Sequence, residues 1–194
     1  MKKHLLFTLL LVLCVCTAYC RPVVANDTIK LKVEGKTAYY IQTVKVDSGI
    51  TEHKIYMRTL EFMAARNFQQ NYGYDEEGKL ICTTTQDLNT NVFSATGDDD
   101  TVDPYTVQFT IIVDMKNRRY RYTINNIVFF LPTETGNMRL TMYEMYLKAT
   151  NTDSRRVARA AQKYISSFER YIGDLTDELY QAIEQKRAID SNKF

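Results

Sequence analysis

The sequence predicts an α+β protein, in which an antiparallel sheet has helices packed on one face and a long C-terminal amphipathic helix follows. Three patterns support this prediction. Apolar residues alternate with mostly polar ones from Tyr105 to Met115, as they do in a half-buried strand. A turn at 116–118 then leads into a second alternating strand, which makes an antiparallel hairpin. Apolar residues at steps of three and four from Val157 to Ile183 indicate a helix of about seven turns.

The length and composition fit one domain of ordinary size. Of the 194 residues, 45% are hydrophobic and 25% are charged. These values exclude a fully disordered chain, a collagen-like chain and a multi-span membrane protein.

Residues 1–25 are predicted to be a secretory signal peptide. Two lysines precede a largely apolar run over residues 5–16, which is shorter than the roughly 20 residues that a membrane-spanning helix needs. Removing the signal takes three of the 25 basic residues and no acid, which leaves 22 against 23, a net charge of −1. A chain without excess positive charge lacks the usual attraction to phosphates, so we expect no nucleic-acid partner.

The fate of the signal peptide leaves alternatives open. Cleavage can follow Ala18 or Ala25, and Ala25 is favoured. Lipoprotein anchoring at Cys20 is less favoured, because Tyr19 is large where the peptidase needs a small residue. We therefore expect an exported protein, periplasmic or secreted, with no transmembrane segment after signal removal.

Only Cys82 would remain of the four cysteines. One thiol cannot form an internal disulfide, so the core alone must stabilise the domain. Cys82 lies in a strand-like run with no histidine or second cysteine nearby, and we interpret it as a small buried hydrophobe.

The first half of the mature chain predicts strands on both sides of one helix. Residues 29–33 alternate like an edge strand, and residues 39–46 are rich in β-branched and aromatic side chains. A helix capped by Thr51 or Ser48 is predicted over 52–68, because apolar residues recur at offsets of four, seven and eight from Tyr56.

Two strands, 71–76 and 79–88, should follow and be joined by a polar turn. Residues 89–104 show no periodicity and predict a long loop. In the returning strand of the hairpin, Tyr120, Tyr122 and Ile124 share the apolar face.

The end of the hairpin and the segment after it are predicted as follows. The run 127–131 is apolar on both faces, so we expect that end of the sheet to be covered on both sides. Residues 132–137 are interpreted as a linker, and 140–148 as a short helix. The predicted organisation is thus a signal peptide (1–25), a sheet domain (26–131), a linker with a short helix (132–152), and a C-terminal helix packing on the sheet (153–194).

The hairpin sequence resembles a known family. Residues 105–127, and above all the run Arg-Tyr-Arg-Tyr-Thr-Ile at 119–124, resemble an exported bacterial family catalogued as a domain of unknown function with a fold like the TATA-binding protein. Residues 77–83 are similar to an earlier strand of that family, so the resemblance covers about residues 39–130. It implies an antiparallel sheet with helices on one face, and it implies no activity, because shared fold does not transfer function.

The hairpin also carries a candidate basic ligand patch. It consists of Lys116, Arg118, Arg119 and Arg121. Cations and aromatic rings on one sheet face can bind anionic polymers, but the alternation places the neighbouring tyrosines on the opposite face from Arg119 and Arg121. A solvated sheet face is therefore the favoured interpretation, and a ligand patch is the alternative.

No other group indicates a reaction centre. Asp98, Asp99, Asp100 and Asp103 could supply oxygens to Ca²⁺, but they lack the spacing of a calcium loop, so a solvated loop is favoured. His53 has no recognisable Ser or Cys partner, and we interpret it as a surface residue. We predict no catalytic residue, no cofactor and no metal site.

The sequence therefore favours an exported non-catalytic domain that binds an unidentified partner in the envelope or outside the cell. This prediction rests on abundant apolar patterning without a clustered titratable set. The alternative is a small-ligand-binding protein or an enzyme with a pocket between the sheet and the helices. Because the C-terminal helix is longer than a small sheet, we expect residues 179–194 to contact another chain.

Overall fold

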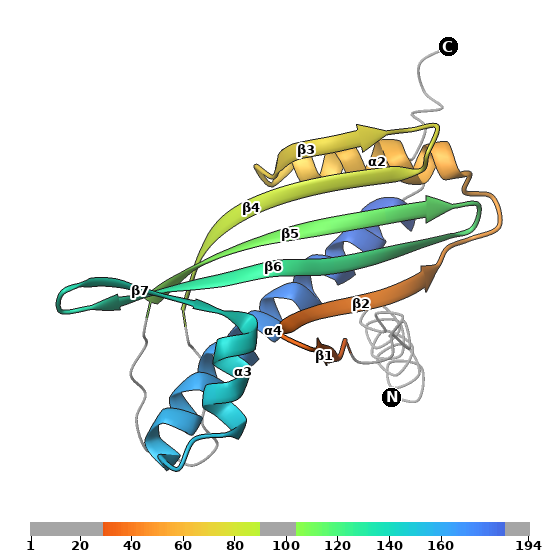
Figure 1. The fold of residues 1–194 in the computed structure, drawn as a ribbon. Coiled ribbons are helices and arrows are strands. Elements are labelled where there is room, and N and C mark those ends of the chain that lie inside the picture. The colour runs from red at the N-terminus through yellow and green to blue at the C-terminus, as the bar shows by residue number, and fades with distance from the viewer. Residues whose placement is uncertain (1–28, 90–103, 185–194) are drawn as a thin grey trace, which may run out of the picture.

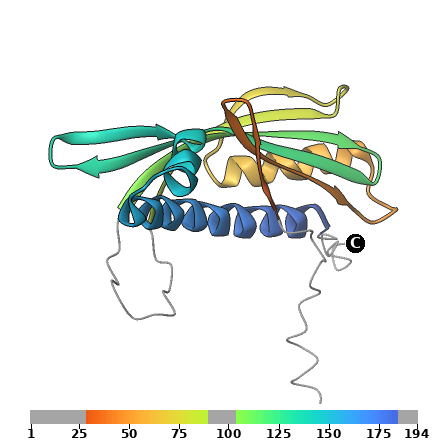
Figure 2. The ribbon, with the colours of Figure 1, turned by 60° about the horizontal axis from the view of Figure 1, so that its bottom comes forward.

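The computed structural model describes residues 29–89 and 104–184, which form one antiparallel sheet with three helices on one face (Figure 1). The strands lie in the order β1-β2-β6-β5-β4-β3, and β7 pairs with β6. Figure 2 shows the helices on one side of the sheet, with the other face uncovered by any of them. The predicted fold class is confirmed.

The elements follow the predicted order along the chain. The strands are β1 (Leu31–Glu34), β2 (Thr37–Lys45), β3 (Gln69–Tyr74), β4 (Lys79–Asn89), β5 (Pro104–Lys116), β6 (Arg119–Thr133) and β7 (Gly136–Thr141). The helices are α2 (Glu52–Ala65), α3 (Met142–Thr150) and α4 (Arg155–Glu184).

The β5–β6 hairpin forms the centre of the sheet, as its strong alternation predicted. All the apolar residues assigned to the inward face are buried: Tyr105, Val107, Phe109, Ile111, Val113, Met115, Tyr120, Tyr122 and Ile124. The register runs without a break from the turn, where Lys116 faces Arg119, to the pair of Thr110 and Asn125. Arg118 takes a φ of 66° at the turn.

A β-bulge at Asn126 explains the apolar run that follows. The register between β5 and β6 shifts after Thr110, and Asn126 takes a φ of 51°, which asparagine tolerates better than most residues. The extra residue reverses the alternation, so that Ile127, Phe129 and Leu131 continue the inward face. Val128 is also buried on the other face and Phe130 is half-buried, so the expected cover on both sides is present in part.

The helix predicted over 52–68 ends earlier, at Ala65. Thr51 is its N-cap, and the Thr51 side chain accepts a hydrogen bond from the Lys54 backbone. Asn67 then takes a φ of 58°, which stops the helix and turns Phe68 into the core. Phe68 lies edge-on to Phe109, with ring centroids 5.9 Å apart.

α4 closes the core through one central aromatic residue. Phe168 is fully buried, and its ring centroid lies 5.5 Å from that of Phe109, 5.8 Å from that of Phe129 and 6.1 Å from that of Tyr40. These three partners come from β5, β6 and β2. One helix residue therefore joins three strands, and the interface between sheet and helix is filled at this point.

Tyrosine hydroxyls add polar contacts across the same interface. Tyr40 donates to the Glu169 carboxylate at 3.2 Å, and Tyr105 donates to Ser167 Oγ at 3.0 Å. Ser167 in turn donates to the Asn89 carbonyl at 2.7 Å. These bonds satisfy polar groups that burial would otherwise leave without partners.

The expected linker at 132–137 is wrong. β6 runs to Thr133 and folds back at once into β7, so that these residues form a hairpin (Figure 1). Gly136 takes a φ of 134° at its tip. The predicted short helix is present as α3, with Thr141 and Glu144 forming a capping box at its start.

The expectation that residues 179–194 contact another chain is not met over the described part of that segment, 179–184, which packs within this molecule. Leu179 and Ile183 are both fully buried within this molecule. Arg58 of α2 donates to the Ile183 carbonyl, and Arg66 forms an ion pair with Glu178. The long strands β5 and β6, together with α2, cover the length of α4, which is longer than a small sheet could cover.

Several predictions fall outside the described residues. They are the signal peptide at 1–25, the lipid site at Cys20, the aspartates at 98–100 and 103, and the chain end after 184. Within the described ranges, no helix combines the length and the apolar character needed to cross a membrane.

Candidate anion-binding site

The predicted basic residues lie around the β5–β6 turn and on the uncovered face of the sheet. Lys116, Arg119 and Arg121 are exposed there, while Tyr120 and Tyr122 are buried on the helix side. The predicted separation of these tyrosines from the arginines is confirmed. The side of the sheet on which these cations lie is called the open face below.

The strand register brings in one more cation, Lys45, which the sequence prediction did not include. Lys45 of β2 faces Arg119 of β6, and Arg119 also faces Lys116 of β5. Neighbouring strands lie about 4.8 Å apart, so the three residues form a line of roughly 10 Å across the end of the sheet. We call Lys45, Arg119 and Lys116 the cationic row.

The cationic row has no carboxylate to neutralise it among residues 29–89 and 104–184. The ion pairs there include His53 with Asp75, Arg66 with Glu178, and Arg121 with Asp114, and none of these pairs involves the row. Like charges directly opposite on neighbouring strands repel each other. The row is therefore a local concentration of positive charge without a direct ion-pair partner among the described residues.

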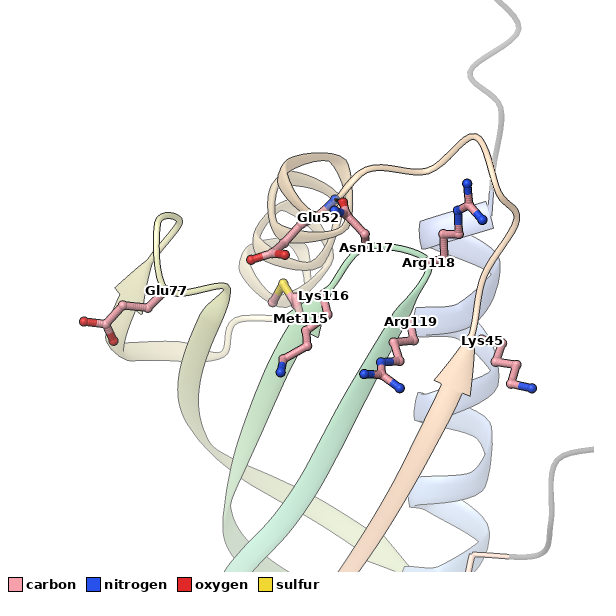
Figure 3. A pocket seen from close by; sticks show the side chains of 8 residues that line it. All are labelled: Lys45, Glu52, Glu77, Met115, Lys116, Asn117, Arg118 and Arg119. Carbon is pink, nitrogen blue, oxygen red and sulfur yellow. Dashed lines mark hydrogen bonds between the residues drawn. The ribbon is translucent and has the colours of Figure 1, made fainter.

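The other two predicted patch residues have different surroundings. The Arg121 guanidinium lies 2.9 Å from an oxygen of Asp114, which faces it on β5. Arg118 projects beyond the turn, away from Lys116 and Arg119 (Figure 3). Its carbonyl accepts a hydrogen bond from the Val46 backbone at 3.0 Å, which connects the turn to the end of β2.

Two neighbouring concavities surround the cationic row. The larger, of about 600 Å³, is lined by Lys45, Glu52, Glu77, Met115, Lys116, Asn117, Arg118 and Arg119 (Figure 3). The smaller, of about 250 Å³, is lined by Thr43, Asp114, Lys116, Arg119, Tyr120 and Arg121. Lys116 and Arg119 line both, so they form the boundary between the two.

Two features of the neighbouring turns hold the walls of the larger concavity in place, a hydrogen bond and a close approach at a glycine. The Asn117 side chain accepts a hydrogen bond from the Glu52 backbone at 3.2 Å, which links the β5–β6 turn to the start of α2. Gly78 has a φ of 57°, and a Cβ there would lie 2.5 Å from the Met115 carbonyl oxygen. Only glycine allows the β3–β4 turn to approach β5 this closely.

Three tyrosines and the cysteine at the interface between sheet and helices are held in their protonated forms by burial. Burial raises the pKa of Tyr105 to about 12 and that of Tyr122 to about 12, and it raises the pKa of Tyr120 still further. Burial also raises the pKa of the Cys82 thiol to about 11, and its side chain is 1% exposed. The interpretation of Cys82 as a small buried hydrophobe is confirmed.

His53 is a surface residue, as predicted. Its side chain is 66% exposed, and its Nδ1 lies 2.5 Å from an Asp75 oxygen. Among the residues that the structure describes, no three of the His, Cys, Asp and Glu side chains gather as a metal site would require. The aspartates at 98–100 and 103 lie outside the described residues.

Comparison with known proteins agrees with the resemblance found in the sequence. Residues 40–130 match a family model described as a domain of unknown function (DUF4468) with TBP-like fold. This segment, just under half of the chain, is similar to that family. It includes Lys45, Lys116 and Arg119, so the whole cationic row lies within it.

Two solved structures have a similar fold. One is a DUF4468 family protein from Bacteroides ovatus, with a TM-score of 0.64 and 13% identity over 80% of this chain and 91% of that chain. The other is a TBP-like protein from Parabacteroides distasonis, with a TM-score of 0.63 and 9% identity over 79% of this chain and 97% of that chain. At these identities the likeness concerns the fold. No curated protein matches the chain.

The description of the DUF4468 family names no activity, so the site must be judged from its own residues. Of the predicted patch, the structure keeps Lys116 and Arg119 together, neutralises Arg121 and separates Arg118. Lys45 could have been found from the alternation of residues 39–46, which places it on the polar face of its strand. That it faces Arg119 depends on the pairing of β2 with β6, which no local pattern specifies.

Proposed function

We propose that this protein is an exported, non-catalytic domain that binds an anionic partner in the envelope or outside the cell through the cationic row. The observation that carries this proposal is the line of three exposed cations that no described carboxylate neutralises. Such a line costs stability in the free protein, and a bound anion would offset that cost. An anionic partner is thus the simplest reason for this arrangement.

The non-catalytic part of the proposal is supported by the distribution of polar groups. The tyrosines of the interface are buried and hold their protons, and their hydroxyls stabilise the contact with α4. The concavities at the cationic row are lined by charged residues without a neighbouring nucleophile and base.

The alternative, a small-ligand protein or enzyme with a pocket between sheet and helices, is less favoured. Phe168 fills the centre of that interface against three strands. A ligand there would have to displace aromatic contacts that are already formed. The two concavities that surround the cationic row instead lie around the β5–β6 turn and the open face.

The binding proposal is tested with three variants of the full exported protein. Wild type, the triple variant K45Q/K116Q/R119Q and the control R139Q, on β7 at the other end of the sheet, are used to capture material from the envelope of cells that make the protein. We expect wild type and R139Q to retain the same component, which moderate salt releases. Equal retention by the triple variant would contradict the proposal.

Export is tested separately, by mass spectrometry of the protein recovered from cells. We expect a chain that begins at Asn26, because Ala25 ends the favoured cleavage site. A chain that begins at Tyr19 would move the cleavage point, and a lipid on Cys20 would replace release with anchoring. An uncleaved chain in the cytoplasm would contradict export.

A further inference from the structure

The composition of the two concavities indicates which kind of anion fits, if the proposed function holds. We infer that the cationic row binds the phosphate group of a phosphate monoester, and that the larger concavity takes the hydroxylated organic part of a sugar or polyol phosphate. This inference rests on the proposed function and adds a ligand class to it. Charge, donor geometry and shape each support it.

Charge favours a dianion over a monoanion. The backbone positions of the three cations span roughly 10 Å across neighbouring strands, and the next outward-facing arginine along β6, Arg121, is already neutralised by Asp114. A phosphate monoester carries a charge of about −1.5 to −2 at neutral pH. A single carboxylate or a phosphodiester would neutralise only one of the three cations.

The donors favour an anion with oxygens in several directions. Arg119 offers a planar fork of N–H groups from the middle strand, and its side chain extends toward the side of Lys116, whereas the Lys45 side chain extends away from Arg119 (Figure 3). The cationic row itself carries donors only, so it suits a group whose oxygens are all acceptors. The three terminal oxygens of a phosphate monoester point in different directions, so that donors on several sides can reach them. The two oxygens of a carboxylate lie in one plane.

The shape of the two concavities indicates where the rest of the ligand would lie. Lys116 and Arg119 line both concavities, so a phosphate held by them lies at the boundary between the two. Glu52, at the start of α2, also lines the larger concavity, and its carboxylate points away from Arg119, toward the β3–β4 turn (Figure 3). A carboxylate there repels a second anionic group and accepts hydrogen bonds from hydroxyls. A polyhydroxylated body is therefore favoured over a polyanion.

The inference is tested by titrating the full protein with small probes, followed by NMR chemical shifts and calorimetry. The probes are glucose 6-phosphate, glycerol 3-phosphate, succinate, methyl sulfate, glucose and a short RNA oligonucleotide. We expect the two phosphates to bind at least tenfold more tightly than succinate or methyl sulfate, and glucose alone not to bind. The amide shifts should centre on residues 45, 116 and 119.

Variants separate the row from its surroundings. Arg119→Gln should weaken glucose 6-phosphate binding at least tenfold, and Arg119→Lys should weaken it less, because the charge remains and the fork is lost. Arg139→Gln, on β7 at the opposite end of the sheet from the β5–β6 turn, should leave affinity within twofold. Glu52→Gln should weaken glucose 6-phosphate more than glycerol 3-phosphate, which carries fewer hydroxyls.

Each contrary result has a distinct meaning. Succinate binding as tightly as the phosphates would overturn the ligand class while leaving an anion site in place. An RNA oligonucleotide that binds when the sugar phosphates do not would replace it with a nucleic-acid surface. If no anion binds, and the triple variant K45Q/K116Q/R119Q also retains the envelope component, both the inference and the proposed function fail.

Discussion

At the scale of single residues, Phe168 shows how one side chain of α4 stabilises the whole interface. Its ring contacts Phe109, Phe129 and Tyr40 from three different strands, and none of its surface is exposed. Replacing it with a small residue would leave a cavity bordered by strands that cannot all move inward.

Phe168→Ala should lower the free energy of unfolding by about 3–5 kcal/mol, because both the transfer free energy and a cavity term are lost. Val157→Ala on the same helix is the matched control, since Val157 is 39% exposed, and it should change stability by less than about 0.5 kcal/mol. Urea unfolding followed by circular dichroism measures both. Similar losses for the two variants would show that Phe168 is not the central contact.

Glu169 should give the protein a pH-dependent stability that can be isolated. Burial raises the pKa of this carboxyl, and the hydrogen bond from Tyr40 lowers it by less. The folded protein therefore holds a proton at pH values where the unfolded chain has already lost it. Stability from this group is present at low pH and falls as pH rises from the ordinary value of 4.5 through the raised pKa.

Glu169→Gln removes this titration, and its amide oxygen can still accept from Tyr40. The unfolding free energy of the variant minus that of wild type should therefore increase as pH rises from 4 toward 7. Glu134→Gln, at the exposed tip of the β6–β7 hairpin, serves as the control and should give a flat difference. A difference for Glu169→Gln that falls with pH would reverse the assigned direction.

At the scale of elements, the bulge at Asn126 separates what local pattern could predict from what it could not. The strand 105–115, the hairpin turn and the first half of β6 follow from period-two alternation, and the structure agrees with all three. Beyond residue 126 the inward-facing positions change from even-numbered to odd-numbered residues. The run 127–131 therefore looked apolar on both faces in the sequence. A bulge needs only one residue with a positive φ, so no periodic signal marks it.

Asn126→Val should lower the free energy of unfolding by about 1–2 kcal/mol, because a β-branched residue at a φ of 51° is strained. Asn126→Gly should stay within about 0.5 kcal/mol of wild type, since glycine adopts this φ without strain. Thermal unfolding of both variants provides the comparison. Equal stability of the two would mean that the bulge relaxes to another register.

The missed strand β7 has a different physical cause. Residues 132–137 contain proline, glycine and asparagine, which are typical of a loop, and they lack the alternation of a buried strand. In the structure they form the tip of a hairpin in which most of β7 is exposed, so neither face needs an apolar pattern. The pairing with β6 supplies the hydrogen bonds that define the strand.

At the scale of the whole molecule, the candidate site depends on tertiary pairing more than on sequence pattern. The alternation correctly placed Arg119 and Arg121 on the polar face, but it could not show that Asp114 neutralises one of them. Lys45 is far from the hairpin in sequence and reaches it only because β2 pairs with β6. The expected contact of this end of α4 with another chain was wrong over residues 179–184 for a similar reason, since α2 and the long strands cover that part of the helix.

The uncompensated charge of the row should be measurable without any ligand. Lys45→Gln should raise the unfolding free energy by about 0.2–1 kcal/mol at low ionic strength, because one repulsive cross-strand contact is removed. The gain should shrink in 0.5 M salt, where screening shortens the range of the repulsion. Arg118→Gln is the control, and a larger gain there than at Lys45 would locate the repulsion outside the row. Thermal unfolding at the two salt concentrations measures these changes.

Hydrogen exchange of the protein, free and bound to its captured envelope component, tests most directly whether the open face binds while the helix face serves as the core. We expect protection to increase at the end of β2 and around the β5–β6 turn, and exchange in α4 to stay unchanged. New protection confined to α4 and the inward strand positions, with none at residues 45 and 116–119, would contradict the account.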